Sequence, residues 1–123
     1  MDKPKGQIEA EISNAITKFE REQLGRGPDE TKTFILQNML IIHLKGVLTP
    51  AERTLAHSAE GEKLIREVRL KIIESSKDII EKMIFKITGC KIVRLFTDLD
   101  PKMGERIFVL LLGKDLQKKI REN

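Results

Sequence analysis

The sequence Gly46-Val47-Leu48-Thr49-Pro50-Ala51-Glu52-Arg53 marks the point in the chain where strand-like patterns give way to helical ones. Gly46 allows the backbone to bend at the end of a strand. Thr49 is a typical helix N-cap, Pro50 suits the first helical position, and Glu52 completes a capping box with Thr49. We therefore predict that a short helix begins here and that these three residues have a structural capping role.

Two apolar runs precede this stretch and predict a β-hairpin. They cover residues 31–36 and 40–47, separated by Gln37-Asn38-Met39, where Asn38 tolerates a positive φ. In the second run one face is wholly apolar, while the other begins apolar and ends polar. This pattern indicates a core on one side and partial cover by another element or subunit on the other.

Helical spacing of apolar residues predicts a helix over residues 5–24 that ends at Gly25. A second helical stripe begins at Ser58, a typical N-cap, and ends at Gly89. This long central helix would extend roughly 40 Å, which is more than a domain of this size requires. We therefore expect it to pack on a partner subunit. The polar residues 75–78 interrupt its pattern and mark either a bend or an exposed turn.

The last third of the chain predicts two more strands, over residues 91–99 and 106–112. The second is apolar on both faces, as expected of a central strand covered on both sides or buried at a dimer interface. The element order α-β-β-α-β-β predicts an α+β two-layer sandwich with a mainly antiparallel four-stranded sheet. We expect a single domain over residues 1–123, with residues 1–5 as a flexible tail and residues from about 114 to 123 as either a short helix or a frayed tail.

Composition narrows the class of protein. The net charge of +4 permits an acidic partner without requiring one, and the single cysteine, Cys90, excludes an intrachain disulfide and fits a reducing compartment. No apolar run approaches the roughly 20 residues of a membrane span, and no signal peptide is evident. We expect a cytoplasmic protein that meets a membrane only peripherally, through a partner. The absence of Trp and Tyr and the interleaved acids argue against nucleic-acid binding.

No catalytic, metal-binding or nucleotide-binding motif is evident, so the sequence favours a non-enzymatic protein without a cofactor. The candidate anion-binding residues are Arg26, Arg53, Arg66 and Arg69. Arg26 lies in a Gly-rich turn after a helix, where a simple helix stop is the alternative. For Arg66 and Arg69, a solvated basic helix face is the alternative. Arg53 has no acid four residues later to pair with, because that position is His57.

Four segments together resemble the MpsC-like family of small bacterial proteins, long catalogued as a domain of unknown function: Gly6-Gln7-Ile8-Glu9, Gly25-Arg26-Gly27-Pro28, the segment from Leu44 to Glu52, and Thr88-Gly89-Cys90 before a strand containing Asp98. The resemblance covers nearly the whole chain, and Leu-Thr-Pro-Ala-Glu is its most specific part. The family takes its name from a Na+-translocating, membrane-potential-generating system. The resemblance therefore implies an accessory role near a membrane complex, and it supplies no catalytic residues.

These observations leave three hypotheses. The first is an accessory or regulatory homodimer that docks on a protein partner. The second is a small-anion or nucleotide-binding module that uses the arginines, and the third, which composition disfavours, is a nucleic-acid binder.

Overall fold

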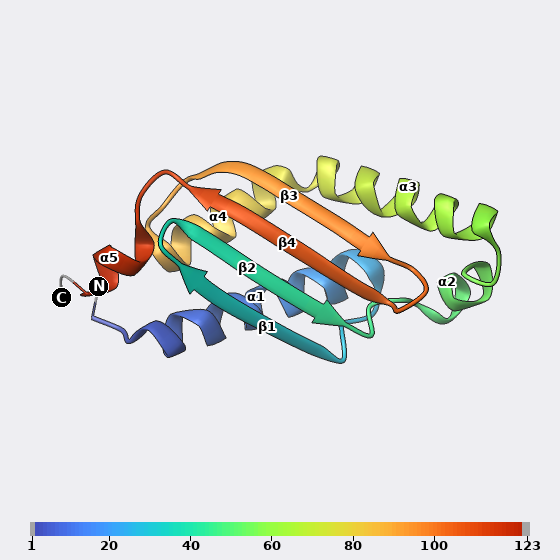
Figure 1. Cartoon of the computed structure of the whole chain (residues 1–123), viewed down its shortest axis with the longest axis horizontal. Coiled ribbons are helices and arrows are strands. Elements are labelled where there is room, and N and C mark those ends of the chain that lie inside the picture. Colours follow the sequence, from blue (N-terminus) through green and yellow to red (C-terminus); the bar gives the residue numbers. More distant parts are fainter. Residues whose placement is uncertain (1, 122–123) are drawn as a thin grey trace.

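A four-stranded antiparallel sheet forms one layer of the protein, and helices form the other (Figure 1). The computed structural model describes residues 2–121, so Met1 and residues 122–123 of the predicted tails lie outside the described residues. The strands are β1 (Glu30–Leu36), β2 (Met39–Lys45), β3 (Ile92–Asp100) and β4 (Glu105–Leu112). Their order in the sheet is β1-β2-β4-β3. Because each neighbouring pair is antiparallel, β2 and β3 run in the same direction, and the helices between them form a crossover connection.

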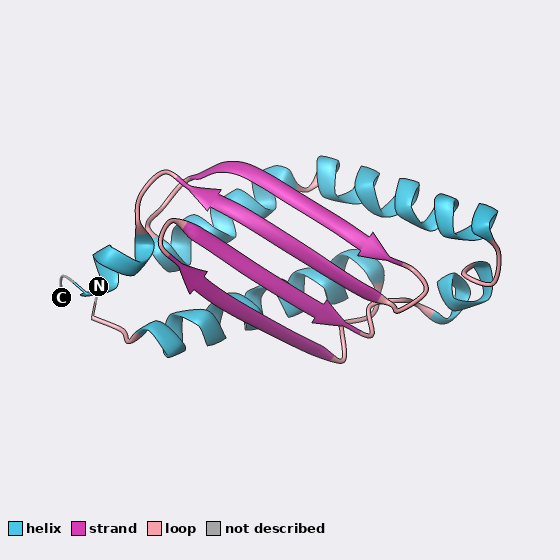
Figure 2. Ribbon diagram, in the orientation of Figure 1, coloured by secondary structure: helices cyan, strands magenta, loops and turns pink. Residues whose placement is uncertain are grey.

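The helices lie behind the sheet or at its ends (Figure 2). They are α1 (Lys5–Leu24), α2 (Pro50–Leu55), α3 (Ala59–Ser75), α4 (Lys77–Thr88) and α5 (Leu116–Arg121). The predicted α+β two-layer class is confirmed, and α1 begins and ends where the sequence predicted. Of the two alternatives for the C-terminal segment, the structure has the short helix, α5, whose Leu116 is buried in the core. None of the helices in residues 2–121 is long and apolar enough to cross a membrane.

The long helix predicted over residues 58–88 is divided into α3 and α4 at Ser76. Ser76 is buried, and its φ of −110° and ψ of 9° lie outside the helical range. The N–H of Ser76 donates to the carbonyl oxygen of Ile73 (3.0 Å), which closes the last turn of α3. The break allows the two helices to run in different directions (Figure 2). Residues 59–88 therefore form two helices instead of one continuous helix, and the break lies within the polar residues 75–78.

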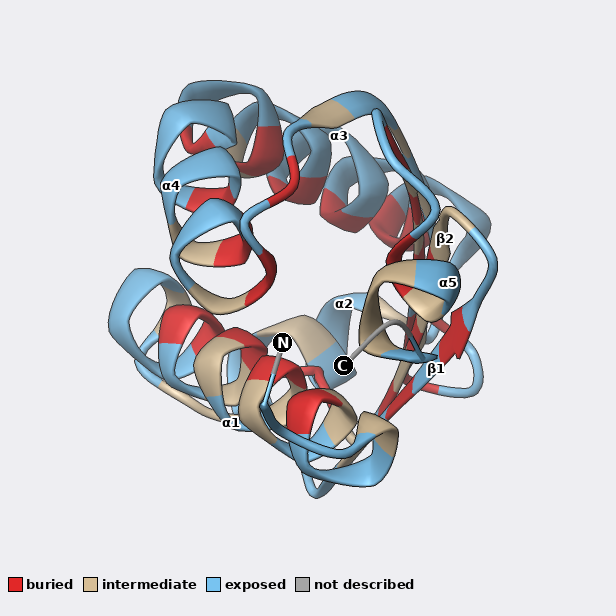
Figure 3. Ribbon diagram, turned by 90° about the vertical axis from the view of Figure 1, so that its left-hand side faces the viewer, coloured by how far each residue is buried: buried red, intermediate tan, exposed pale blue. Residues whose placement is uncertain are grey.

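The core is aliphatic and lies where the helices face the sheet (Figure 3). From α1 it receives Ile8, Ile12, Ile16 and Phe19, at spacings of three and four residues, so that one stripe of the helix is buried. The sheet contributes alternate residues from each strand, as the two-residue period of a strand requires. Burial of this apolar surface is what holds the two layers together.

The turn between β1 and β2 has a different left-handed residue from the one predicted. Gln37, not Asn38, has the positive φ, at 57°. Asn38 instead connects the turn to the end of β4: its carbonyl oxygen accepts from the N–H of Leu112 (2.8 Å), and its Nδ2 donates to the Leu112 carbonyl (3.3 Å). Asn38 is therefore held by contacts with the end of β4, which rules based on neighbouring residues in the sequence do not describe.

The face of the sheet that points away from the helices is uncovered and largely apolar. Four rows of side chains cross it in the order β1, β2, β4, β3, and we call them together the open face: Leu36, Met39, Leu111 and Arg94; Phe34, Ile41, Val109 and Phe96; Lys32, His43, Ile107 and Asp98; Glu30, Lys45, Glu105 and Asp100. The first two rows are apolar except for Arg94, and the last row is charged. Phe34, Phe96 and Ile107 are all exposed. The predicted apolar character of both faces of β4 is therefore present, but only one face is covered.

Candidate functional site

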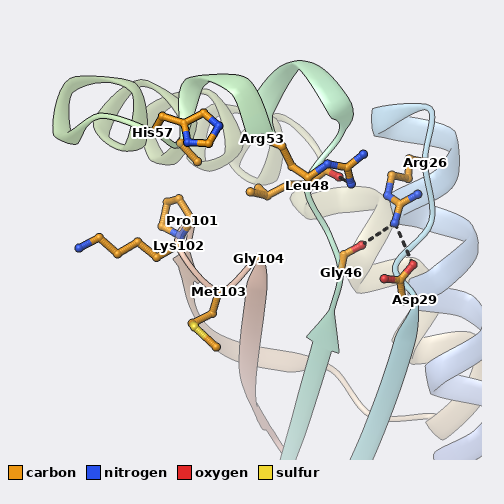
Figure 4. A pocket seen from close by; sticks show the side chains of 11 residues that line it. Arg26, Asp29, Gly46, Leu48, Arg53, His57, Pro101, Lys102, Met103 and Gly104 are labelled. Atoms are coloured by element: carbon orange, nitrogen blue, oxygen red, sulfur yellow. Dashed lines mark hydrogen bonds and ion pairs between the residues drawn. The ribbon is translucent and has the colours of Figure 1, made fainter.

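A cavity of about 470 Å³ lies at the end of the sheet where β2 leads into α2 (Figure 4). Three segments that are distant in sequence line it. They are the loop between α1 and β1, which supplies Arg26 and Asp29; the link from Gly46 to His57; and the turn between β3 and β4, over residues 101–104. The cavity thus collects two of the segments on which the family resemblance rests. We take it as the candidate functional site.

Arg26 is held in place at one wall of the cavity. Its Nη2 donates to Asp29 Oδ1 (2.8 Å) and to the carbonyl oxygen of Gly46 (3.3 Å). Gly46 has a φ of +65°, and a Cβ added there would overlap the carboxylate of Asp29. A glycine is therefore required at this position by both backbone conformation and space. The result is a fixed contact between the loop after α1 and the end of β2.

The link from β2 to α2 is also attached to the turn between β3 and β4. The N–H of Val47 donates to the carbonyl oxygen of Gly104 (3.0 Å). Within that turn, Asp100 Oδ1 accepts from the N–H groups of Lys102 (3.0 Å) and Met103 (3.3 Å), so this acid organises the turn. A backbone hydrogen bond therefore joins two of the three segments that line the cavity.

Arg53 is exposed and makes little use of its charge. Its Nη1 donates to the carbonyl oxygen of Leu48 at 3.4 Å, and it forms no ion pair with any of residues 2–121. The side chains of His57 and Lys102 likewise form no hydrogen bond or ion pair within the described part of the chain. Asp29 is the one acid among those of residues 2–121 that line the cavity. The cavity is therefore basic, and three of its four basic side chains have no acidic partner in that part.

Beneath α2, Arg69 lies almost completely buried, with 1% of its side chain exposed, and forms a two-pronged ion pair with Glu52. Its Nε donates to Glu52 Oε2 and its Nη2 to Glu52 Oε1, both at 2.7 Å. Nη2 also donates to the carbonyl oxygen of Val47 (2.6 Å). The guanidinium of Arg69 is therefore occupied within the fold. The sequence offered a signal for this role, because Arg69 lies between Ile65 and Ile73 on the buried stripe of α3.

Glu52 combines this ion pair with the capping box. Its Oε1 accepts from the N–H of Thr49 (2.9 Å), while Thr49 Oγ1 accepts from the N–H of Glu52 (3.2 Å), and Pro50 occupies the first helical position. Burial favours a higher pKa for Glu52, but the hydrogen bonds from Arg69 and Thr49 outweigh it and hold the pKa below its ordinary value. Because α2 has six residues and buries none of them, these contacts are what attach it to the core.

Two further buried charges, Glu20 and Arg106, extend the network into the core. Glu20 Oε1 lies 3.6 Å from Arg69 Nη1, and burial raises the pKa of Glu20 against the opposing influence of Arg106 and Arg69. Arg106 Nη1 donates to Thr97 Oγ1 (2.6 Å), and its guanidinium lies 5.3 Å from the centre of the Phe108 ring. Burial lowers the pKa of Arg106. The sequence reasoning missed both residues, although Arg106 alternates with Phe108 and Leu110 on the inward face of β4.

The four arginines proposed from the sequence thus separate into three settings. Arg26 and Arg53 line the same cavity, and Arg69 is buried beneath it. Arg66 is exposed and donates from Nε to the carbonyl oxygen of Leu99 (3.3 Å), outside the cavity. His43 lies on the open face, where its Nε2 is 2.8 Å from Glu105 Oε1. The structure therefore brings together two of the four arginines at a surface that a ligand can reach.

The fold and the site define an α+β protein with one uncovered sheet face and a basic cavity at the end of the sheet. The chain belongs to the MpsC family, because the family described as Na+-translocating membrane potential-generating system (MpsC) matches residues 4–114. This match confirms the resemblance drawn from the sequence. Uncharacterized protein YbcI of Bacillus subtilis (strain 168) is 44% identical over 122 residues, which cover 99% of this chain and 98% of that protein. Uncharacterized protein YrhF of the same organism is 33% identical over 101 residues, or 80% of each chain. No solved structure shows a significant match.

Proposed function

We propose that this protein is a non-enzymatic accessory or regulatory protein that forms a homodimer through its open face and docks on a partner in a cation-translocating membrane system. The observation that carries the dimer is the apolar centre of the open face. Phe34 and Phe96 are each 51% exposed at the two edges of one row, with Ile41 and Val109 between them. A contiguous apolar surface of this kind is typical of an interaction site.

A second copy of the chain fits this surface because the open face is complementary to itself. In a symmetric dimer the same surface must pair with its own rotated copy. A two-fold axis parallel to the strands places β1 of one copy over β3 of the other, and β2 over β4. Phe34 then meets the partner's Phe96, and Lys32 meets the partner's Asp98, because each pair shares a row. In the Phe34 row apolar residues thus face apolar residues, and Lys32 and Lys45 face the acids Asp98 and Glu105 of the other copy, whereas the acids Glu30 and Asp100 face each other at the charged end.

Light scattering tests the dimer directly. We expect the wild-type protein at micromolar concentration to have twice the 14.1 kDa mass of the chain. Phe34→Lys and Phe96→Lys should shift the mass to that of the monomer, because each places a charge in the apolar row. Val68→Lys on α3 is the matched control, since Val68 is 53% exposed on the helical layer. Circular dichroism on each variant checks that it remains folded.

A charge reversal tests the orientation of the two copies. Lys32→Glu should weaken the dimer, because it places two acids together, and the double variant Lys32→Glu/Asp98→Lys should restore it. A monomeric wild type at micromolar concentration would refute the dimer. Dissociation by Val68→Lys but not by Phe34→Lys would transfer the interface to α3.

The link to a membrane system is supported by the description of the family. If it is correct, the protein should sediment with membrane vesicles that contain the translocating system and stay in solution with vesicles of lipid alone. Sedimentation with both kinds of vesicle would indicate binding to lipid and contradict docking on a protein partner.

A further inference from the structure

We infer that the cavity between the α1–β1 loop, α2 and the β3–β4 turn binds a small phosphorylated molecule, with the phosphate at Arg26 and Arg53 and an uncharged, apolar or aromatic part against Leu48, Pro101 and Met103. This site is separate from the open face, so the inference does not depend on the proposed dimer. It rests on the charge of the cavity, the placement of the two arginines, and the character of the remaining wall.

The charge of the cavity favours an anion. Within the described part of the chain, four basic side chains line it, and Asp29 is the one acid that does. Asp29 is already engaged by Arg26 at 2.8 Å. Arg53, His57 and Lys102 therefore contribute positive charge, or for His57 the capacity for it, without an acidic partner among residues 2–121. An anionic ligand would reduce the repulsion among these groups.

Arg26 and Arg53 are placed to act together. Their guanidinium groups donate to carbonyl oxygens two residues apart in one loop, those of Gly46 and Leu48. Figure 4 shows both side chains on the same side of the cavity, with Lys102 and His57 on the other side. The flat, forked donor geometry of guanidinium matches the oxygens of a phosphate better than an ammonium group does. Arg26 is fixed by its bonds, whereas Arg53 has most of its donors free to meet a ligand.

The rest of the wall is suited to an uncharged group. Leu48, Pro101 and Met103 line the cavity, and Met103 is 67% exposed, which is high for a large apolar side chain. A ligand that covers it removes apolar surface from water. The volume of about 470 Å³ lies in the range of small-molecule sites, roughly 300–1,000 Å³. A phosphate carried on an apolar or aromatic body therefore fits the cavity better than a free phosphate does.

An alternative is that these arginines have only structural roles. This explanation suits Arg26, which joins the α1–β1 loop to the end of β2. It suits Arg53 less well, because this side chain is exposed and its one hydrogen bond among residues 2–121 is long, at 3.4 Å. Arg53 is therefore the residue whose substitution distinguishes ligand binding from structure.

Calorimetric titration of the full chain with ADP, pyrophosphate and adenosine tests the inference at low ionic strength. We expect ADP to bind more tightly than either pyrophosphate or adenosine, because only ADP carries both parts of the proposed ligand. Arg53→Gln should weaken ADP binding by about tenfold or more, the expected loss for one charge-assisted hydrogen bond. Arg66→Gln is the matched control: it removes the same charge from an exposed arginine outside the cavity and should change the affinity by less than about twofold.

Three results would overturn the inference. The first is the absence of ADP and pyrophosphate binding to the wild type at millimolar concentration. The second is an equal loss of affinity in Arg53→Gln and Arg66→Gln, which would indicate general attraction to a basic protein. The third is equal affinity for ADP and pyrophosphate, which would leave the apolar wall without a role. Light scattering on Arg53→Gln should give the mass of the wild type, so failure of this site is distinguishable from failure of the proposed dimer.

Discussion

Replacement of Glu52 by Gln separates the two roles of this side chain. A Gln at the same position can still accept from the N–H of Thr49, because Glu and Gln both complete a capping box. It cannot supply the negative charge that Arg69 meets at 2.7 Å through two of its nitrogens. The variant therefore keeps the cap of α2 and removes the ion pair. Thr49→Ala does the reverse, since it removes the cap and leaves the ion pair.

The two variants should differ clearly in the free energy of unfolding. Loss of an N-cap costs about 1 kcal/mol. Removal of one partner from a buried ion pair costs about 3–5 kcal/mol, because the remaining charge is left uncompensated. Glu52 retains 15% exposure, and Glu20 Oε1 lies 3.6 Å from Arg69 Nη1 as a second counter-charge. We therefore expect Glu52→Gln to lie at the lower end of that range, at about 3 kcal/mol.

Urea unfolding followed by circular dichroism measures both losses, with all variants at one protein concentration so that any association contributes equally. The double variant Glu52→Gln/Arg69→Met removes both members of the ion pair and should be more stable than Glu52→Gln alone, because Arg69 is then no longer left as an uncompensated buried charge, while Glu20 keeps the opposite charge of Arg106 nearby. A loss of only about 1 kcal/mol for Glu52→Gln, equal to that of Thr49→Ala, would refute the reasoning, since the ion pair would then contribute no more than a cap.

Two further predictions concern Glu20 and two glycines. Because burial raises the pKa of Glu20 above its ordinary 4.5, the folded state binds more protons than the unfolded state above that pH, and this residue's contribution to stability falls as pH rises from 4.5 through the raised pKa. The stability of Glu20→Gln relative to wild type, from urea unfolding, should therefore increase from pH 4.5 to neutrality; a constant difference would contradict the raised pKa. Gly61→Ala should cost about 1–3 kcal/mol, because its Cβ would overlap the carbonyl oxygen of Leu55 and force apart the corner between α2 and α3. Gly6→Ala, where no atom lies within 4 Å of the added Cβ, should stabilise the protein by up to about 1 kcal/mol. Equal melting temperatures of Gly61→Ala and Gly6→Ala would show that the corner between α2 and α3 tolerates a side chain.

Features governed by local rules could be predicted from the sequence. The ends of α1, the capping box at Thr49 and the glycine at the end of α4 depend on residues within one or two turns, and each lies where its local signal predicted. The break at Ser76 was visible only as an ambiguous polar run. Whether such a run bends a helix depends on what the helix packs against, and the sequence does not state that.

The buried charges and the cavity could not be predicted in the same way. Arg69 meets Glu52 across 17 positions in the sequence, and the cavity joins residues as distant as Arg26 and Met103. An arginine on the apolar stripe of a helix does indicate a buried role, but the stripe does not identify its partner. The apolar outer face of β4 was predictable from its sequence, whereas the second copy of the chain that we propose to cover it could not be identified from β4 alone.

Glu52 and Arg53 show how the buried network and the cavity depend on each other. The two residues are adjacent on α2, yet Glu52 pairs with a buried guanidinium and Arg53 lines the cavity. A six-residue helix that buries none of its residues is not stable alone, so α2 keeps its position through its cap and through Glu52. A fixed α2 presents Arg53 to a ligand in one place, which reduces the entropy lost on binding. The Glu52–Arg69 ion pair therefore supports the proposed anion site by holding α2, and with it Arg53, in place without touching the ligand. The strength of this ion pair limits how firmly Arg53 is held.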